Sequence, residues 1–98
     1  MRQKLAKYYH VSRLPNLCQD GLKIGKLTSC SIYKLSKHIY VGDLDYLLKQ
    51  YLQYCPKGTY YIYEVEIDSF DLEELPAKNH WRTTKSMMPS KIIQTITV

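Results

Sequence analysis

Residues 38–51 restrict the fold of this 98-residue chain more than any other part of the sequence. Residues 38–41 read as a short buried strand, and Gly42 then gives the backbone freedom to turn. Asp43 or Asp45 can cap a helix by accepting a backbone N–H group. The apolar residues that follow keep the spacing of one helical face, at Leu44, Leu47, Leu48, Tyr51, Leu52 and Cys55. We therefore expect a strand that leads directly into an amphipathic helix ending near Cys55.

Two pairs of side chains stand out as candidate site residues. Tyr40 lies at the end of the expected strand, and Tyr51 lies on the helix face that packs back on it. Two aromatic rings across such a corner can flank a flat ligand, although two core tyrosines would give the same pattern. His10 and Ser12 form the second pair, because side chains two residues apart on a strand point to the same side. They can hydrogen-bond a ribose or an amide, or His10 can be a structural histidine at a sheet edge.

The remaining elements follow from alternation and turn signals. The clearest strand covers residues 59–67, where Glu64 and Glu66 share one side that we interpret as a solvated polar face. A final β-branched strand is expected at residues 91–98, and residues 76–88 read as irregular. The other expected elements are a strand at 7–11, a short helix at 15–19, a loop at 26–35 and a short helix or extended turn at 70–75.

The net charge of +5 is unevenly distributed along the chain. Before Gly42 the only acid is Asp20, the other acids lie between residues 43 and 74, and only bases follow Leu75. If the two ends pack together, they form a cationic face that attracts phosphate, nucleic acid or an acidic partner, although a merely solvated lysine face fits equally well. The basic residues of this expected face are Arg2, Lys4, Lys7, Arg82, Lys85 and Lys91.

The cysteines and the apolar pattern restrict location and chemistry. Cys18, Cys30 and Cys55 are odd in number and widely spaced, which indicates reduced thiols and a cytoplasmic protein. No apolar run is long enough to span a membrane, and we expect no signal peptide. Neither the cysteines nor the histidines have the spacing of a metal site. The four glycines are dispersed, so there is no glycine-rich phosphate loop.

Several short motifs, taken in order, resemble the ADP-ribosyltransferase superfamily, in particular its diphtheria-toxin and poly-ADP-ribose-polymerase branch. They comprise Tyr-His-Val-Ser at 9–12, Leu17 with Gly21 and Leu22, Ile-Tyr-Val at 39–41 followed by Asp43 and a helix, Glu-Val-Glu-Ile at 64–67 and Pro-Ser-Lys-Ile at 89–92. The resemblance implies an α+β fold with a small, split, mostly antiparallel sheet, one main helix and one short helix. We expect residues 1–98 to form this single domain.

The resemblance also implies a role for each matched residue. His10 matches the histidine that binds the adenosine-side ribose of NAD, and Ser12 matches the residue that hydrogen-bonds the nicotinamide amide. Val11 stands where the family usually has glycine, and its backbone would contact the same amide. Tyr40 matches the signature tyrosine, and Tyr51 matches the aromatic residue that stacks on nicotinamide. These five residues are the expected NAD site, with His10 and Tyr40 as its catalytic residues.

The third signature residue, a glutamate just before the last strand, is missing, because residues 88–94 contain no acid. The resemblance therefore implies a mono-ADP-ribosyltransferase that uses NAD as its substrate and modifies an unknown protein or nucleic-acid acceptor. The alternative is a catalytically inactive protein of the same fold, such as an anti-defence inhibitor encoded by a phage or mobile element, that binds through its basic surface. A third interpretation, RNA end processing as in the tRNA 2′-phosphotransferases, needs basic motif residues that we cannot match.

Overall fold

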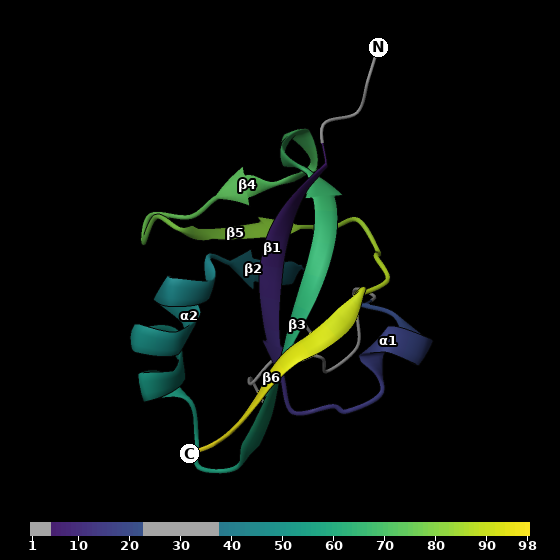
Figure 1. Ribbon diagram of the computed structural model, residues 1–98. Coiled ribbons are helices and arrows are strands. Elements are labelled where there is room, and N and C mark those ends of the chain that lie inside the picture. The colour runs from purple at the N-terminus through teal and green to yellow at the C-terminus, as the bar shows by residue number, and fades with distance from the viewer. Residues whose placement is uncertain (1–4, 23–37) are drawn as a thin grey trace.

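The computed structural model describes residues 5–22 and 38–98, and these residues form one six-stranded sheet with helices packed on both faces (Figure 1). The elements are β1 (Leu5–Ser12), α1 (Leu17–Asp20), β2 (Ile39–Gly42), α2 (Leu44–Lys49), the 3₁₀ turn η1 (Tyr51–Tyr54), β3 (Thr59–Asp68), the 3₁₀ turn η2 (Ser69–Asp71), β4 (Glu73–Glu74), β5 (His80–Thr83) and β6 (Lys91–Thr97). The expected α+β class, with one main and one short helix, is confirmed.

The sheet runs in the order β4-β5-β2-β1-β3-β6, and every pair of neighbouring strands is antiparallel. β1 and β3 pair along the whole length of β1, from Leu5 to Ser12. In contrast, β1 and β2 pair at a single position among the described residues, where Tyr9 lies opposite Gly42. The sheet is therefore split into two three-stranded halves, which run in different directions in Figure 1.

Each face of the sheet has its own core. On the face that we call the α1 face, α1 packs on β2 and β3, and the buried residues are Leu17, Leu22, Ile39, Val41, Tyr63 and Val65. On the opposite face, the α2 face, α2 and η1 pack on β1 and β3, and the buried residues are Val11, Leu47, Leu52, Tyr60 and Ile62. The alternation of β3 produces this division, since successive side chains of a strand point to opposite faces.

Tyr63 shows how a tyrosine-rich chain can bury its rings without leaving hydroxyl groups unpaired. Its ring is fully buried on the α1 face. Its hydroxyl donates a hydrogen bond to the carbonyl oxygen of Leu14 and accepts one from the backbone N–H of Leu17 at 3.3 Å. Burial raises the pKa of the Tyr63 phenol. The ring thus fixes α1 and the turn before it on the sheet.

The main helix is shorter than its apolar pattern predicts. α2 ends at Lys49, Gln50 stays in the right-handed helical region with φ −119° and ψ −54°, and η1 follows. Pro56 ends the whole helical segment, because the residue before a proline favours an extended backbone, and Cys55 has φ −85° and ψ 144°. The chain tightens into a 3₁₀ turn before this point and still buries Leu52.

Residues 70–88 contain more regular structure than the sequence indicates. Residues 70–75, expected as a short helix or an extended turn, contain the end of the 3₁₀ turn η2 and the short strand β4. The segment read as irregular contains β5, which pairs with β2 from His80 to Thr83. This strand has no simple apolar pattern, because His80 and Arg82 alternate with Trp81 and Thr83. The expected loop at residues 26–35 lies outside the described residues.

Candidate functional site

His80 stands at the centre of a group of aromatic rings on the α2 face. Its ring centroid lies 5.8 Å from that of Tyr40, 5.3 Å from that of Tyr46 and 5.5 Å from that of Tyr51. The ring of His38 lies 6.3 Å from that of Tyr40. We call Tyr40, Tyr46, Tyr51 and His80 the tyrosine–histidine cluster. All four side chains are half-buried, so the cluster is open to solvent at its edge.

The backbone pairing of β2 and β5 places the strand residues of the cluster. His80 lies opposite Gly42, and Arg82 lies opposite Tyr40. Opposed residues of an antiparallel pair point to the same face, so all of these side chains are on the α2 face. Helix α2 and turn η1 lie on that face too and supply Tyr46 and Tyr51.

A tight turn before β5 holds His80 against the start of α2. Lys78 and Asn79 both have φ of 54°, a left-handed conformation that is uncommon outside glycine. The carbonyl oxygen of Asn79 accepts a 2.9 Å hydrogen bond from the backbone N–H of Asp43. Asp43 occupies the N-cap position of α2 but makes no side-chain cap bond, and Asp45 forms an ion pair with Lys49 at 3.2 Å. The turn, rather than either expected aspartate side chain, therefore fixes the start of the helix.

Burial lowers the pKa of His80 below its ordinary value of 6.5, because desolvation penalises the charged imidazolium. The ring is therefore neutral at pH 7. A neutral imidazole has one nitrogen that donates a hydrogen bond and one that accepts it. The cluster thus combines flat apolar surface with polar groups at its edge, which is the composition of a site for a planar heterocycle.

Arg82 lies beside the cluster and is paired with Glu73. Its Nε donates a hydrogen bond to Oε1 of Glu73, which is directly opposite it on β4. This bond, together with a hydrogen bond to the side chain of Tyr40, raises the pKa of Arg82, and the same guanidinium lowers the pKa of Glu73. A guanidinium next to aromatic rings can recognise phosphate or carboxylate groups.

His10 lies at the place where the sheet splits, with 1% of its surface exposed. Its Nδ1 lies 2.6 Å from the backbone carbonyl oxygen of Tyr40. Continuing the register of Tyr9 and Gly42 would place Val11 opposite Tyr40, but β1 and β2 have no such pair among the described residues. The imidazole therefore joins β1 to the backbone of Tyr40 at a place where the two strands have no backbone pair among the described residues.

Ser12 and Val11 also have packing roles. The Oγ of Ser12 is buried and accepts a 3.0 Å hydrogen bond from the backbone N–H of Leu14, which closes the turn after β1. The side chain of Val11 belongs to the core beneath α2. Neither side chain is placed at the surface of the tyrosine–histidine cluster.

The five residues expected to bind NAD are thus divided between the two faces of the sheet. Tyr40 and Tyr51 come together through His80 on the α2 face. His10 and Ser12 point to the α1 face, because the residues opposite them in β3 belong to that face. The structure brings His10 to the backbone of Tyr40 but not to its ring.

Sequence reasoning missed His80 as a site residue and assigned Arg82 only to the expected cationic face, because both lie in the segment read as irregular. The available signal was the alternation of these two polar residues with Trp81 and Thr83, which fits a strand that separates two different environments. Glu64 was also misread, since its expected solvated position is 8% exposed in the structure.

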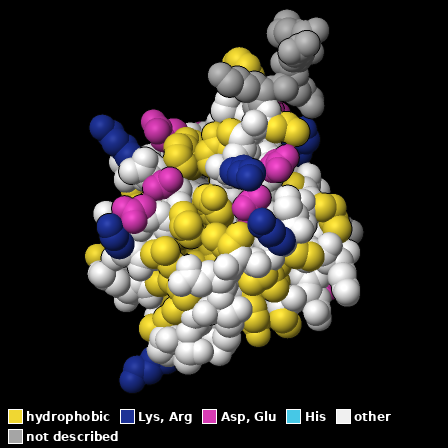
Figure 2. Space-filling model, in the orientation of Figure 1, with side chains coloured by type: hydrophobic (Ala, Val, Ile, Leu, Met, Phe, Trp, Pro, Cys, Tyr) yellow, Lys and Arg dark blue, Asp and Glu magenta, His cyan; other side chains and the backbone are white. Residues whose placement is uncertain are grey.

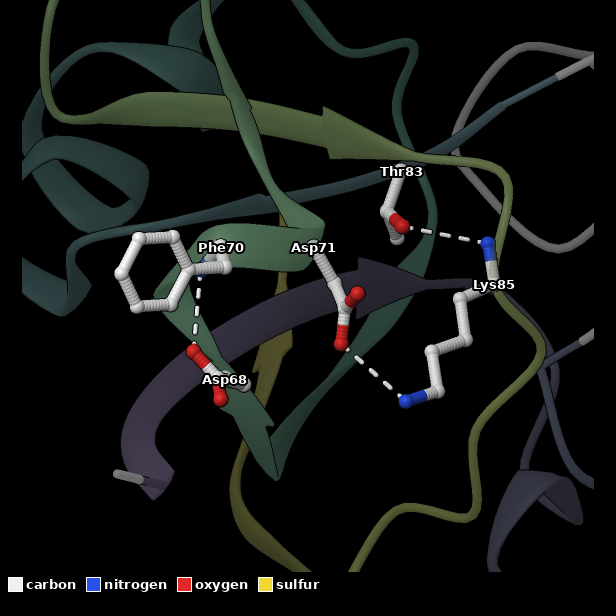
Figure 3. Close-up of polar contacts among 5 residues, drawn as sticks. All are labelled: Asp68, Phe70, Asp71, Thr83 and Lys85. Carbon is white, nitrogen blue, oxygen red and sulfur yellow. Dashed lines mark hydrogen bonds and ion pairs between the residues drawn. The ribbon is translucent and has the colours of Figure 1, made fainter. Parts of the chain in front are cut away.

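In the described part of the chain, acids lie beside three bases of the expected cationic face. Figure 2 shows basic and acidic side chains side by side on one face, and Figure 3 shows one such pair, Lys85 with Asp71. Arg2 and Lys4 lie outside the described residues. The ion pairs are Lys7–Glu64 at 3.6 Å, Arg82–Glu73 and Lys85–Asp71 at 3.0 Å, and Lys91 lies opposite Glu64.

Within the described ranges, no group of histidine, cysteine and acidic side chains could hold a metal ion. None of the helices in this part of the chain is long and apolar enough to cross a bilayer. Cys18 and Cys55 are thiols, and Cys30 lies outside the described residues. No protein-family model matches the chain, and comparisons with curated proteins and with solved structures find no match either. The resemblance to ADP-ribosyltransferases therefore rests on the short sequence motifs alone.

Proposed function

We propose that this protein is a nucleotide-binding domain that takes NAD and holds one of its flat rings on the tyrosine–histidine cluster. The observation that carries the proposal is that Tyr40 and Tyr51, selected from the sequence as a stacking pair, both contact His80 on one face. Tyr51 of η1 packs against the α2 core, and Tyr40 comes from β2, whose Gly42 adjoins the side chain of Leu47 in that core. The cluster is thus a prepared surface rather than a chance contact of loop side chains.

The physical chemistry of the cluster suits a planar ligand. Stacking of a base on an aromatic side chain is worth about 1–3 kcal/mol and does not depend strongly on which base is present. The rings are half-buried, so each is held by the core and still offers surface to a ligand. The neutral imidazole of His80 adds a hydrogen-bonding group that an amide or a purine can meet.

Binding of this kind does not need the side chains of His10 and Ser12 to touch the ligand. Both are buried on the α1 face and bonded to backbone groups of the fold. His10 serves the site as a positioning residue, because its Nδ1 holds the carbonyl oxygen of Tyr40 and so fixes the strand that presents the ring. This role differs from the direct contact with ribose that the resemblance implies.

Mono-ADP-ribosyl transfer is the second candidate, and the contact between His10 and Tyr40 favours it. These are the two signature residues that the resemblance matches, and they meet although they are 30 positions apart in the sequence. In this reaction the bond between nicotinamide and ribose breaks through an oxocarbenium-like state, nicotinamide leaves, and a nucleophile of the acceptor forms the new bond. Orientation of NAD on the cluster would supply much of the rate enhancement.

Isothermal titration calorimetry with NAD tests the binding proposal. Tyr40→Leu and His80→Ala should each weaken binding by about tenfold through lost stacking. Tyr54→Ala is the matched control, because Tyr54 belongs to the same turn as Tyr51 but is 87% exposed, and this variant should bind as the wild type does. Absence of binding at millimolar NAD, or equal weakening in the control, would contradict the proposal.

Transfer is tested separately with NAD labelled in its adenosine half and a cell lysate as the source of acceptors. Single labelled ADP-ribose units that disappear in Tyr40→Leu would support the transferase. Polymeric ADP-ribose would contradict it, because the chain has no acid near Ser90 to activate a ribose hydroxyl for elongation. Binding of NAD without any label transfer would leave the protein as a binding domain.

A further inference from the structure

We propose that Arg82 is the phosphate-binding residue of this site. In the absence of ligand its guanidinium is paired with Glu73, and the phosphate of a bound ligand displaces the Glu73 carboxylate. The inference rests on the proposed nucleotide site and specifies that the site recognises the phosphate group as well as the flat ring. It predicts that nucleotides are selected over nucleosides, and it assigns the selection to one exchangeable ion pair.

The three groups form a row across adjacent strands. Tyr40 on β2 lies directly opposite Arg82 on β5, which lies directly opposite Glu73 on β4. Neighbouring strands are about 4.8 Å apart, so the guanidinium stands between an aromatic ring and a carboxylate on one face. A nucleotide that stacks on the cluster carries its 5′-phosphate one ribose away from the base. Arg82 is placed on the neighbouring strand to receive that phosphate.

The ion pair can be exchanged because it is exposed. The side chains of Arg82 and Glu73 retain 34% and 60% of their accessible surface. Ion pairs in contact with water contribute little, since solvent competes for both partners. A phosphate group offers more charge and more acceptor oxygens than a carboxylate, and the guanidinium can meet it with two parallel hydrogen bonds. Exchange also leaves no buried charge behind, because Glu73 returns to water.

The other arginine that the structure describes is engaged elsewhere. The Nη2 of Arg13 donates a 3.0 Å hydrogen bond to the carbonyl oxygen of Lys57, and its guanidinium lies 5.3 Å from the centroid of the Tyr60 ring. Tyr60 lies on β3, two strands away from β2. Arg82 is therefore the arginine of the described residues that lies beside the tyrosine–histidine cluster.

The test compares each nucleoside with its own 5′-monophosphate, in the adenine and the nicotinamide form, by calorimetry on the full chain. The wild type should bind the monophosphate about tenfold more tightly than the nucleoside, with a difference that shrinks as salt is added. Glu73→Gln should tighten monophosphate binding about threefold and leave nucleoside binding unchanged, because it removes the competing anion. Arg82→Lys should reduce the preference for the monophosphate.

Glu74→Gln is the matched control, because it makes the same charge change at the next residue. Glu74 lies opposite Trp81 and therefore points to the other face of the sheet. A second readout, the NMR signal of the Arg82 Nε–H group, should shift with the monophosphate and not with the nucleoside.

The outcomes separate the two proposals. The role of Arg82 would be overturned by equal wild-type affinities for nucleoside and monophosphate, or by equal effects of Glu73→Gln and Glu74→Gln. Neither result would contradict the proposed stacking site. If none of the four ligands binds the wild type, both proposals are wrong.

Discussion

Replacement of Gly42 by alanine should destabilise the protein by about 1–3 kcal/mol, because the new methyl group has no space. A Cβ atom at Gly42 would lie 3.0 Å from Cδ2 of Leu47, 3.1 Å from its Cγ and 3.2 Å from the carbonyl oxygen of Asn79. Favourable contact between carbon atoms needs about 3.5–4.0 Å, so the Leu47 side chain or the Asn79 carbonyl must give by a few tenths of an ångström. The carbonyl is constrained, since it accepts the N–H of Asp43 at 2.9 Å. Movement of the turn would add the loss of that hydrogen bond, which is worth about 1 kcal/mol.

The same geometry predicts coupling between Gly42 and Leu47. Leu47 is 2% exposed, and Leu47→Ala alone should cost about 2–5 kcal/mol by leaving a cavity. In the double variant the new methyl group at position 42 fills part of that cavity. The stability loss of the double variant should therefore be at least about 1 kcal/mol smaller than the sum of the two single losses. Leu17→Ala is the control partner, because Leu17 is equally buried but lies in the α1 core. Its loss should add to that of Gly42→Ala without coupling.

Urea denaturation followed by circular dichroism measures these free energies of unfolding. The comparison requires that the slope of the unfolding free energy against urea concentration is the same in all variants. Two results would refute the reasoning. One is a Gly42→Ala protein as stable as the wild type, which would mean that the contacts relax at no cost. The other is additivity of Gly42→Ala and Leu47→Ala within about 0.5 kcal/mol, which would mean that the two sites do not share space.

Two further predictions concern the turn and the histidine of the cluster. Lys78→Gly should raise the free energy of unfolding by about 1 kcal/mol in the same denaturation assay, because Lys78 has φ of 54° and glycine adopts that conformation without strain; a loss of stability would contradict this. The pKa of His80 is lower in the folded than in the unfolded protein, so the unfolded state binds more protons as the pH falls below 6.5. The stability of the wild type should therefore decrease from about pH 7.5 to about pH 5. The stability of His80→Gln, which retains all other titrating groups, should decrease less over the same range. Equal decreases would show that His80 does not contribute.

The elements that could be predicted from sequence are those with a local cause. The strand at residues 59–67 has side chains that alternate between two cores, and β3 covers this range. The turn from β2 into α2 follows from Gly42 and the apolar spacing after it. The length of α2 could not be read from that spacing, because a 3₁₀ turn buries Leu52 almost as a helix does. Strand β5 was harder to predict, since its only local signal is the alternation of His80 and Arg82 with Trp81 and Thr83 over four residues.

The candidate site could be predicted only in part, because it depends on strand register. Tyr9 lies opposite Gly42, so Tyr9 and Gly42 share the α2 face, and Tyr40, two residues before Gly42, points there as well. His10 follows Tyr9 and must point to the other face. A slip of one residue between β1 and β2 would reverse this assignment, and nothing in the spacing of short motifs records the register. Two matched motifs can therefore lie on adjacent strands while their side chains serve opposite faces. The register that separates His10 from the ring of Tyr40 also aligns Tyr40 with Arg82 and Glu73, so the chemistry of this site has to be sought across the strands rather than along the sequence.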